Sequence, residues 1–270
     1  MPDPTVADAK VANAIVQRLK DHDFKITLWS IPEDDLRRVV ISDSAFDTSG
    51  QSKSQHGWIV GYTTPELAQG FSAPLSLVSW KSRRLRRKAG SSLLCEALSG
   101  TKAVSNLLWI ANLDMSMRVT GHRHGDPLIE DPREPPTVLT RQSRRNQDPA
   151  AQIVMDAKAL YDSLMSEQTN QDDERACLEV SIIKEDFQVL GCVPRWVPHD
   201  KNPSDALAKA EGAHAMPLVN LLKTPRFKIR AEAEELEERK EIKQEYGYVP
   251  RPRHQVRTIK ASQLNFDECD

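Results

Sequence analysis

The order of strand-like and helix-like segments is the feature that most constrains the fold of this chain. Three runs rich in β-branched and aromatic residues follow one another at 38–42, 57–63 and 75–80, with polar turns between them. Consecutive strands of this kind are typical of an antiparallel meander. Helical and strand-like segments then alternate, which predicts an α/β sheet with helices packed on its faces.

The second half of this pattern begins with a long helix. Ser91 and Ser92 precede apolar residues that recur at helical spacing as far as Ala111. A short apolar strand is then expected at 153–156, helices at 157–166 and 173–190, and a strand at 193–197. Pro194 indicates that this last strand lies at an edge or ends there, because proline has no amide proton to donate. A final helix is expected to begin at Asp205.

The length of 270 residues accommodates one domain of about 150 to 200 residues with appendages. We expect the main domain at 35–215, with an exposed insertion at 120–150 that is rich in Arg, Asp, Pro and His. Residues 1–34 are expected to form a helical connecting segment. Residues 216–270 are expected to form a charged helix and an extended basic tail without a folded core.

The composition excludes several classes of protein. A formal net charge of -2 gives no overall attraction to nucleic acid, so a polyanion site would need a local basic cluster. The four cysteines are widely spaced without a Cys-x-x-Cys pair, which disfavours zinc and favours reduced thiols. No apolar run of 18 residues and no signal peptide is present, so we expect an intracellular protein without a membrane span.

Four acidic residues lie where apolar or small residues surround them, namely Asp43, Glu96, Asp156 and Asp205. Asp43 ends the first strand-like run, and Asp156 ends the fourth. Glu96 lies at the margin of the apolar face of the long helix, and Asp205 opens the last helix. A carboxylate on a half-buried element loses hydration free energy unless a metal or another cation compensates it. If the four converge, they predict a divalent metal site.

The segments around these acids resemble the ribonuclease H domain of copia-type LTR-retrotransposon Pol polyproteins. The resemblance covers about residues 35–215 and depends on five segments in the expected order, at 39–46, 78–85, 91–98, 156–162 and 203–209. It implies an RNase H-like fold, with a five-stranded mixed sheet of three antiparallel and then two parallel strands, flanked by helices. It also implies that the N-terminal segment joins this domain to a reverse transcriptase polymerase domain.

The resemblance further implies a metal-dependent endoribonuclease that hydrolyses the RNA strand of an RNA/DNA hybrid. Two Mg²⁺ ions, or Mn²⁺ in their place, would lie about 4 Å apart and activate the water and the leaving group. Carboxylates are the ligands that Mg²⁺ prefers. Asp43 would bridge both ions, Glu96 and Asp156 would complete one site, and Asp205 would complete the other. An enzyme of this kind is expected in the cytoplasm or nucleus, or in a particle of its element.

Two further features are candidates for contact with substrate. His199, shortly before Asp205, is either a histidine that assists proton transfer or product release, or a solvent-exposed loop residue. Between the third strand and the long helix, six of eight residues are basic: Lys81, Arg83, Arg84, Arg86, Arg87 and Lys88. They form either a solvated charged loop or a contact for the phosphate backbone. Their position near the acids favours the phosphate contact.

Two other functions compete with the nuclease. One is a catalytically inactive adaptor that keeps the fold and binds nucleic acid or the polymerase, since fold and motif do not prove activity. The other is a transposase or integrase of the same fold superfamily. Those enzymes carry their glutamate last, on a late helix, whereas Glu96 is second in this chain. The transposase is therefore disfavoured.

Overall fold

The computed structural model describes residues 5–21, 25–47, 54–118, 121, 123, 149–166, 173–209 and 212–245. The chain divides into two compact units, at 1–232 and 233–270. In the first unit, helix α1 (Val6–Asp21) confirms the helix that was expected near the N-terminus. Most of the predicted insertion at 120–150 lies outside the described residues.

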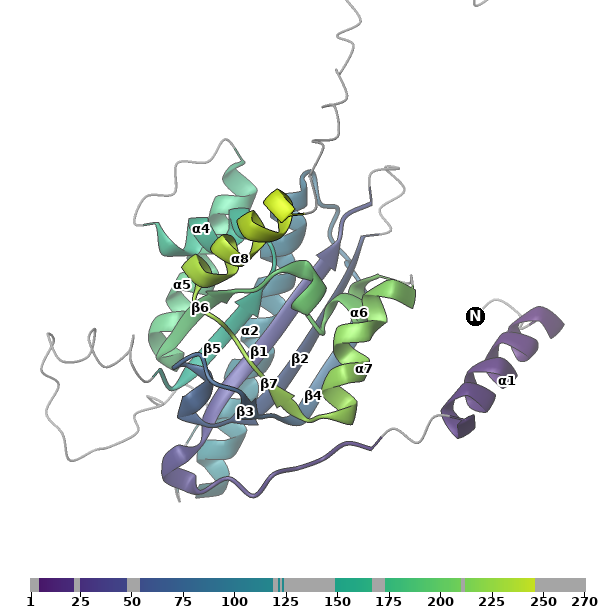
Figure 1. The fold of residues 1–270 in the computed structure, drawn as a ribbon, viewed down its shortest axis with the longest axis horizontal. Coiled ribbons are helices and arrows are strands. Elements are labelled where there is room, and N and C mark those ends of the chain that lie inside the picture. The colour runs from purple at the N-terminus through teal and green to yellow at the C-terminus, as the bar shows by residue number, and fades with distance from the viewer. Residues whose placement is uncertain are drawn as a thin grey trace, which may run out of the picture. The chain divides into compact units, whose positions relative to one another are not determined.

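A five-stranded mixed sheet forms the centre of the first unit, with the strand order β4-β2-β1-β5-β6 (Figure 1). The strands are β1 (Arg37–Ala45), β2 (Gln55–Thr63), β4 (Ser76–Arg84), β5 (Ala151–Met155) and β6 (Cys192–Trp196). The pairs β1–β2 and β2–β4 are antiparallel, whereas β1–β5 and β5–β6 are parallel. This topology confirms the predicted RNase H-like fold, and β6 is an edge strand as Pro194 indicated.

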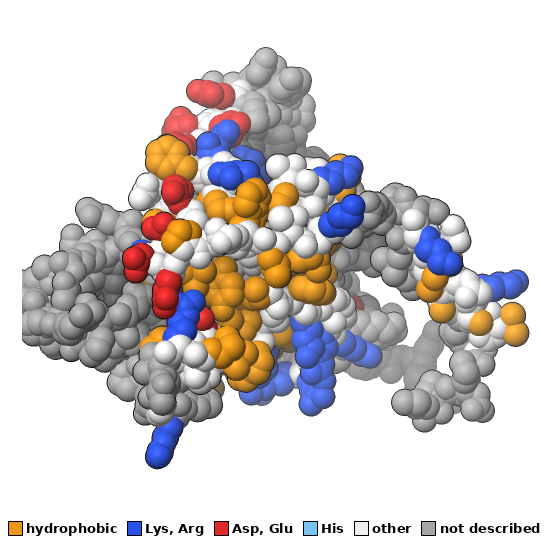
Figure 2. Space-filling model, turned by 90° about the horizontal axis from the view of Figure 1, so that it is seen from below, with side chains coloured by type: hydrophobic (Ala, Val, Ile, Leu, Met, Phe, Trp, Pro, Cys, Tyr) orange, Lys and Arg blue, Asp and Glu red, His pale blue; other side chains and the backbone are white. Residues whose placement is uncertain are grey.

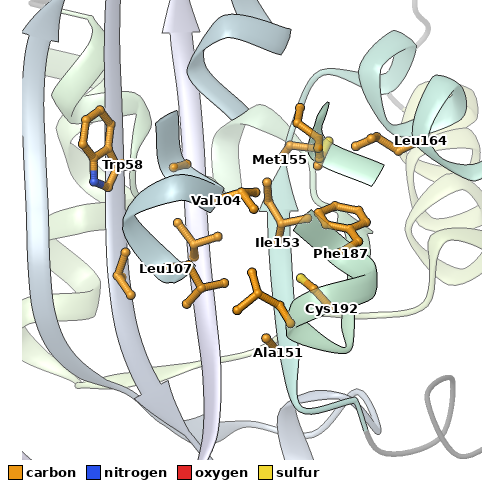
Figure 3. Close-up of a cluster of buried hydrophobic side chains, with 14 of the residues drawn as sticks. Trp58, Val104, Leu107, Ala151, Ile153, Met155, Leu164, Phe187 and Cys192 are labelled. Carbon is orange, nitrogen blue, oxygen red and sulfur yellow. The ribbon is translucent and has the colours of Figure 1, made fainter. Parts of the chain in front are cut away.

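Helices cover both faces of this sheet. On one face lie α2 (Ser92–Arg118), α4 (Lys158–Met165) and α5 (Glu174–Leu190), whose apolar residues pack on Val40, Val60 and Ile153. Figure 3 shows part of this core around Ile153. On the other lie α6 (Asp205–Ala208) and α7 (Met216–Lys223), which face Val39, Ile41 and Ile59. Because successive strand residues point to opposite faces, the unbroken apolar run in β1 serves both layers.

The main domain extends further than its expected end at residue 215. Leu221 of α7 and Phe227 of β7 (Arg226–Phe227) are buried in the core, as is Ile229. Strand β7 pairs with β3 (Ala73–Pro74) in a separate two-stranded sheet. The expectation of no core after 215 was therefore wrong, because the high charge of the later residues concealed an amphipathic helix. The charged helix itself is present as α8 (Glu232–Glu245), and residues 246–270 lie outside the described part.

The tryptophans of the sheet and its helices divide between the core and the surface. Trp58 and Trp196 are buried. Trp80 on β4 and Trp109 on α2 are 52% and 58% exposed. Figure 2 shows one face on which exposed hydrophobic side chains lie among charged ones. None of the helices in the described part of the chain combines the length and hydropathy that a membrane span requires.

Candidate metal-dependent active site

Two of the predicted acids come from neighbouring parallel strands. The register of β1 and β5 pairs Ile41 with Val154, and Asp43 and Asp156 each follow two residues later. Adjacent strands lie about 4.8 Å apart, so the two carboxylates meet at the same end of the sheet. Asp43 is 1% exposed, whereas Asp156, just past the end of β5, is half-buried.

Asp205 joins them as the first residue of α6, where it is fully buried. Carboxylate oxygens of Asp43, Asp156 and Asp205 all lie within 4.8 Å of one another. The structure thus brings together three of the four predicted acids in one group.

Asn202 fixes the start of α6 against β1, and the sequence reasoning did not identify it. Its side chain is fully buried, and its Nδ2 donates to the carbonyl oxygen of Ser42 at 3.1 Å. Its Oδ1 accepts from the backbone N–H of Ser204 at 3.1 Å and from the Ser204 hydroxyl at 2.7 Å. Because all these groups are buried, each hydrogen bond matters for placing Asp205 beside Asp43.

Glu96 approaches from α2 on the opposite face. The helix is attached next to Asp43, since the hydroxyl of Ser99 donates to the carbonyl oxygen of Asp43 at 2.8 Å. Burial, and then repulsion by Asp156, raises the pKa of Glu96 to about 8. Glu96 does not belong to the group of three within 4.8 Å, but it is close enough to interact electrostatically with that group.

The electrostatics of Asp43 are those of a crowded, desolvated carboxyl group. Burial is the main cause that raises its pKa to about 9, followed by the charges of Asp156 and Glu96. Burial also raises the pKa of Asp156. In contrast, hydrogen bonds from Lys209 and other partners outweigh burial at Asp205 and lower its pKa.

A lysine and a histidine that sequence reasoning missed contact these acids. Nζ of Lys209 lies 3.2 Å from Oδ2 of Asp43 and also contacts Oδ1 of Asp205. Nδ1 of His214 contacts Oδ2 of Asp205. Burial alone would lower the pKa of Lys209, but Asp205 and Asp43 together outweigh it and raise that pKa. The position of Lys209 four residues after Asp205 was the available signal, because residues at this spacing meet on a helix.

His199 occupies a different environment. It begins the short 3₁₀ helix His199–Lys201, its side chain is 65% exposed, and its Nδ1 lies 4.0 Å from Asp200. The group of ligand atoms around Asp43 does not include it. Among the described residues, the histidine in contact with the acids is His214.

The basic cluster begins on the edge strand next to the site. The paired rows of the sheet align Asp43 with Gly57 of β2 and Gly57 with Ser82 of β4, so Lys81 and Arg83 stand on either side of that row. Because side chains alternate along a strand, Lys81 and Arg83 point to the face that α2 covers, opposite to the side chain of Asp43. Burial, and then the charge of Arg83, lowers the pKa of His56 to about 4. Lys81, Arg84, Arg86, Arg87 and Lys88 are exposed, and Arg83 is partly buried.

Arg87 differs from the other basic residues because it has a buried partner. Its Nη1 lies 2.5 Å from Oε1 of Glu179, whose other oxygen accepts from the hydroxyl of Thr101 at 2.8 Å. Glu179 is 5% exposed, whereas Arg87 is 69% exposed. Arg87 thus neutralises a buried carboxylate on α5 as well as adding charge to the surface.

The donor set fits a hard divalent cation. It consists of carboxylate oxygens alone, the ligands that Mg²⁺ prefers over nitrogen or sulfur donors. Oδ2 of Asp43 is buried and accepts no hydrogen bond within the described residues, although Nζ of Lys209 lies near it. Such an oxygen retains lone pairs for a metal.

No family model matches the sequence, and no curated protein matches it either. Among solved structures, the N-terminal RNase H domain of a Mycobacterium tuberculosis protein is 11% identical, covering 68% of this chain and 98% of that chain, with a TM-score of 0.39. RNase H1 of Halobacterium salinarum is 12% identical with the same coverage and a TM-score of 0.40. A foamy viral protease-reverse transcriptase in complex with RNA/DNA hybrid is 12% identical, covering 71% of this chain and 22% of that chain, with a TM-score of 0.36. Because these TM-scores are low, the fold is assigned from the order and directions of the five strands in the sheet and not from these similarities.

Proposed function

We propose that this chain is a metal-dependent ribonuclease H that hydrolyses the RNA strand of an RNA/DNA hybrid. The observation that carries the proposal is the convergence of Asp43, Asp156 and Asp205 within 4.8 Å, with Glu96 in electrostatic reach. Four carboxylates of this kind repel one another in the metal-free protein. A site that destabilises its own charges is suited to binding divalent cations.

Bound Mg²⁺ would supply an activated water and stabilise the leaving 3′ oxygen. Asp43, Asp156 and Asp205 would hold the metal through their clustered oxygens, and Glu96 would complete the set from α2. The rigid attachments of these elements, at Ser99 and Asn202, would keep the carboxylates in position during turnover. His199 would act from the exposed 3₁₀ helix before α6, in proton transfer or product release.

The basic residues would hold the hybrid across the edge of the sheet. Lys81 and Arg83 lie on the face of the sheet that α2 covers, from which Glu96 approaches, so a phosphate backbone lying along that face of β4 would reach the end of the sheet that holds the acids. RNA would be chosen through its 2′-hydroxyl groups and the shape of the minor groove. We place Arg84, Arg86, Arg87 and Lys88 in the same surface, with Arg87 tied also to Glu179.

The biological setting that we propose is a copia-type retrotransposon Pol polyprotein. In that setting the main domain would act beside a reverse transcriptase polymerase domain, in the cytoplasm or nucleus where the element's RNA is copied. Residues 1–34 would connect the two domains. The segment after α8 would be a charged spacer.

A catalytically inactive adaptor is the second candidate. The observation that favours it is Lys209, whose ammonium group already pairs with Asp205 and lies next to Asp43. A protein that no longer uses metal would be stabilised by such an internal ion pair. It would bind hybrid without cutting it.

The test is cleavage of a labelled RNA/DNA hybrid by the purified chain with Mg²⁺ or Mn²⁺, with and without a polymerase partner. We expect RNA cleavage by the parent protein, and a loss of about 100-fold or more in Asp43→Asn and Asp156→Asn. Asp34→Asn is the control, because Asp34 is exposed in the short 3₁₀ helix Glu33–Asp35 before β1. Hybrid binding without cleavage would favour the adaptor, and full activity in both site variants would refute the site.

A further inference from the structure

One lysine lies where the acidic group would receive a metal ion. Nζ of Lys209 is 3.2 Å from Oδ2 of Asp43 and contacts Oδ1 of Asp205, so a single ammonium group joins two of the three clustered acids. Asp43 and Asp205 are almost fully buried, whereas the Lys209 side chain is 29% exposed. The cation is therefore the accessible member of a buried ionic group.

The backbone around Lys209 allows its side chain to leave. Helix α6 has only four residues, and Lys209 follows it in an extended conformation with φ -118° and ψ 138°. Asp43 and Asp205, in contrast, are fixed by strand pairing and by the Asn202 hydrogen bonds. A flexible four-carbon side chain on a short element can swing toward solvent while the acids stay in place.

We propose that Lys209 is a displaceable counter-cation: it pairs with Asp205 and lies against Asp43 in the metal-free protein, and a divalent metal must displace it to bind. This inference rests on the proposed function of the site. Without Lys209, Asp43 would lose the ammonium group beside it and Asp205 would retain His214 as its partner, and the loss of one partner from a buried ionic group is destabilising. Lys209 thus allows the chain to fold before metal arrives, but it competes with metal for the same oxygen atoms.

The first test measures metal binding with Mn²⁺ as the probe, by calorimetry and by electron paramagnetic resonance. Lys209→Met should bind Mn²⁺ about tenfold more tightly than the parent, because the competing charge is gone. In EDTA the same variant should melt several degrees lower. Lys223→Met, an exposed lysine on α7, is the matched control and should change neither property. Equal or weaker Mn²⁺ binding by Lys209→Met would overturn the inference.

A second test uses the parent chain and so does not depend on the variant folding. The lysines are acetylated with a low concentration of an amine-reactive reagent, and mass spectrometry measures the labelling of each one. The labelling rate of Lys209 reports how accessible its amino group is. Saturating Mg²⁺ should raise the labelling rate of Lys209 severalfold and leave Lys223 unchanged. Unchanged labelling of Lys209 while Mn²⁺ still binds would overturn displacement. Failure of the parent and Lys209→Met to bind Mn²⁺ would instead overturn the metal-dependent function, whereas binding without hybrid cleavage would refute only the nuclease.

Discussion

Gly57 lies directly against Leu207, and the absence of a side chain at Gly57 is what allows α6 to reach the sheet. A Cβ atom on Gly57 would overlap the Cβ of Leu207 and lie 2.9 Å from its carbonyl carbon. Gly57 is also the cross-strand partner of Asp43. The distance between α6 and β1, and so between Asp205 and Asp43, depends on this contact.

Gly57→Ala should therefore damage the site. Because the obstructing atoms include backbone, α6 must shift, and we expect a loss of about 1–3 kcal/mol in the free energy of unfolding with a larger fractional loss of hybrid cleavage. Urea unfolding and cleavage rates measure the two effects. Gly90→Ala is the control, since a Cβ there meets nothing within 4 Å. Parent-like activity in Gly57→Ala would show that α6 does not position the acids.

Asn202→Ala should loosen the start of α6. The substitution leaves the Ser42 carbonyl oxygen and the Ser204 groups without their buried partner, which costs about 1–3 kcal/mol. Since Asp205 follows three residues later, the affinity for Mn²⁺ should fall together with stability. Asn220→Ala on the exposed side of α7 is the control. A stability loss with unchanged Mn²⁺ affinity would mean that Asn202 supports the fold alone.

The metal-free protein should lose stability as pH rises from 7 to 9. The pKa of Asp43 is raised to about 9 and that of Glu96 to about 8, whereas both groups are ionised at these pH values in the unfolded chain. The folded state thus binds more protons, so the free energy of unfolding falls with pH, by about 1 kcal/mol or more. Urea unfolding in EDTA measures it, and saturating Mg²⁺ should remove the effect. The opposite slope in EDTA would contradict the crowding of these acids.

Substitutions of the basic residues should have two different effects, one on hybrid binding and the other on the stability of the fold. Replacing Lys81, Arg83 and Arg86 by Gln should weaken hybrid binding and reduce the slope of log affinity against log salt by about 0.9 for each lost phosphate contact. Arg87→Gln should instead lower stability, because Glu179 would keep its burial and lose its partner. Fluorescence anisotropy and urea unfolding distinguish the two effects. A salt slope unchanged by the triple substitution would remove these residues from the hybrid surface.

Sequence reasoning was most accurate where a pattern is local. The apolar run of β1 and the helical spacing of α2 gave the element order, and the acids at element ends gave three of the converging carboxylates. Residues that act through a contact distant in the chain were missed. Asn202 reads as an ordinary turn residue, and Gly57 reads as a weak point in a strand. Only tertiary packing reveals that each one positions α6.

The parallel pairing of β1 with β5 has a consequence for when the acidic group is completed during synthesis of the chain. The meander of β1, β2 and β4 can form from the first third of the chain, but it carries Asp43 alone. Asp156 and Asp205 lie more than a hundred residues after Asp43 in the sequence, and contacts between such distant segments form late in folding. A nascent or truncated chain that ends before α6 would therefore hold an incomplete acidic group. A divalent metal ion could then stabilise only the complete fold.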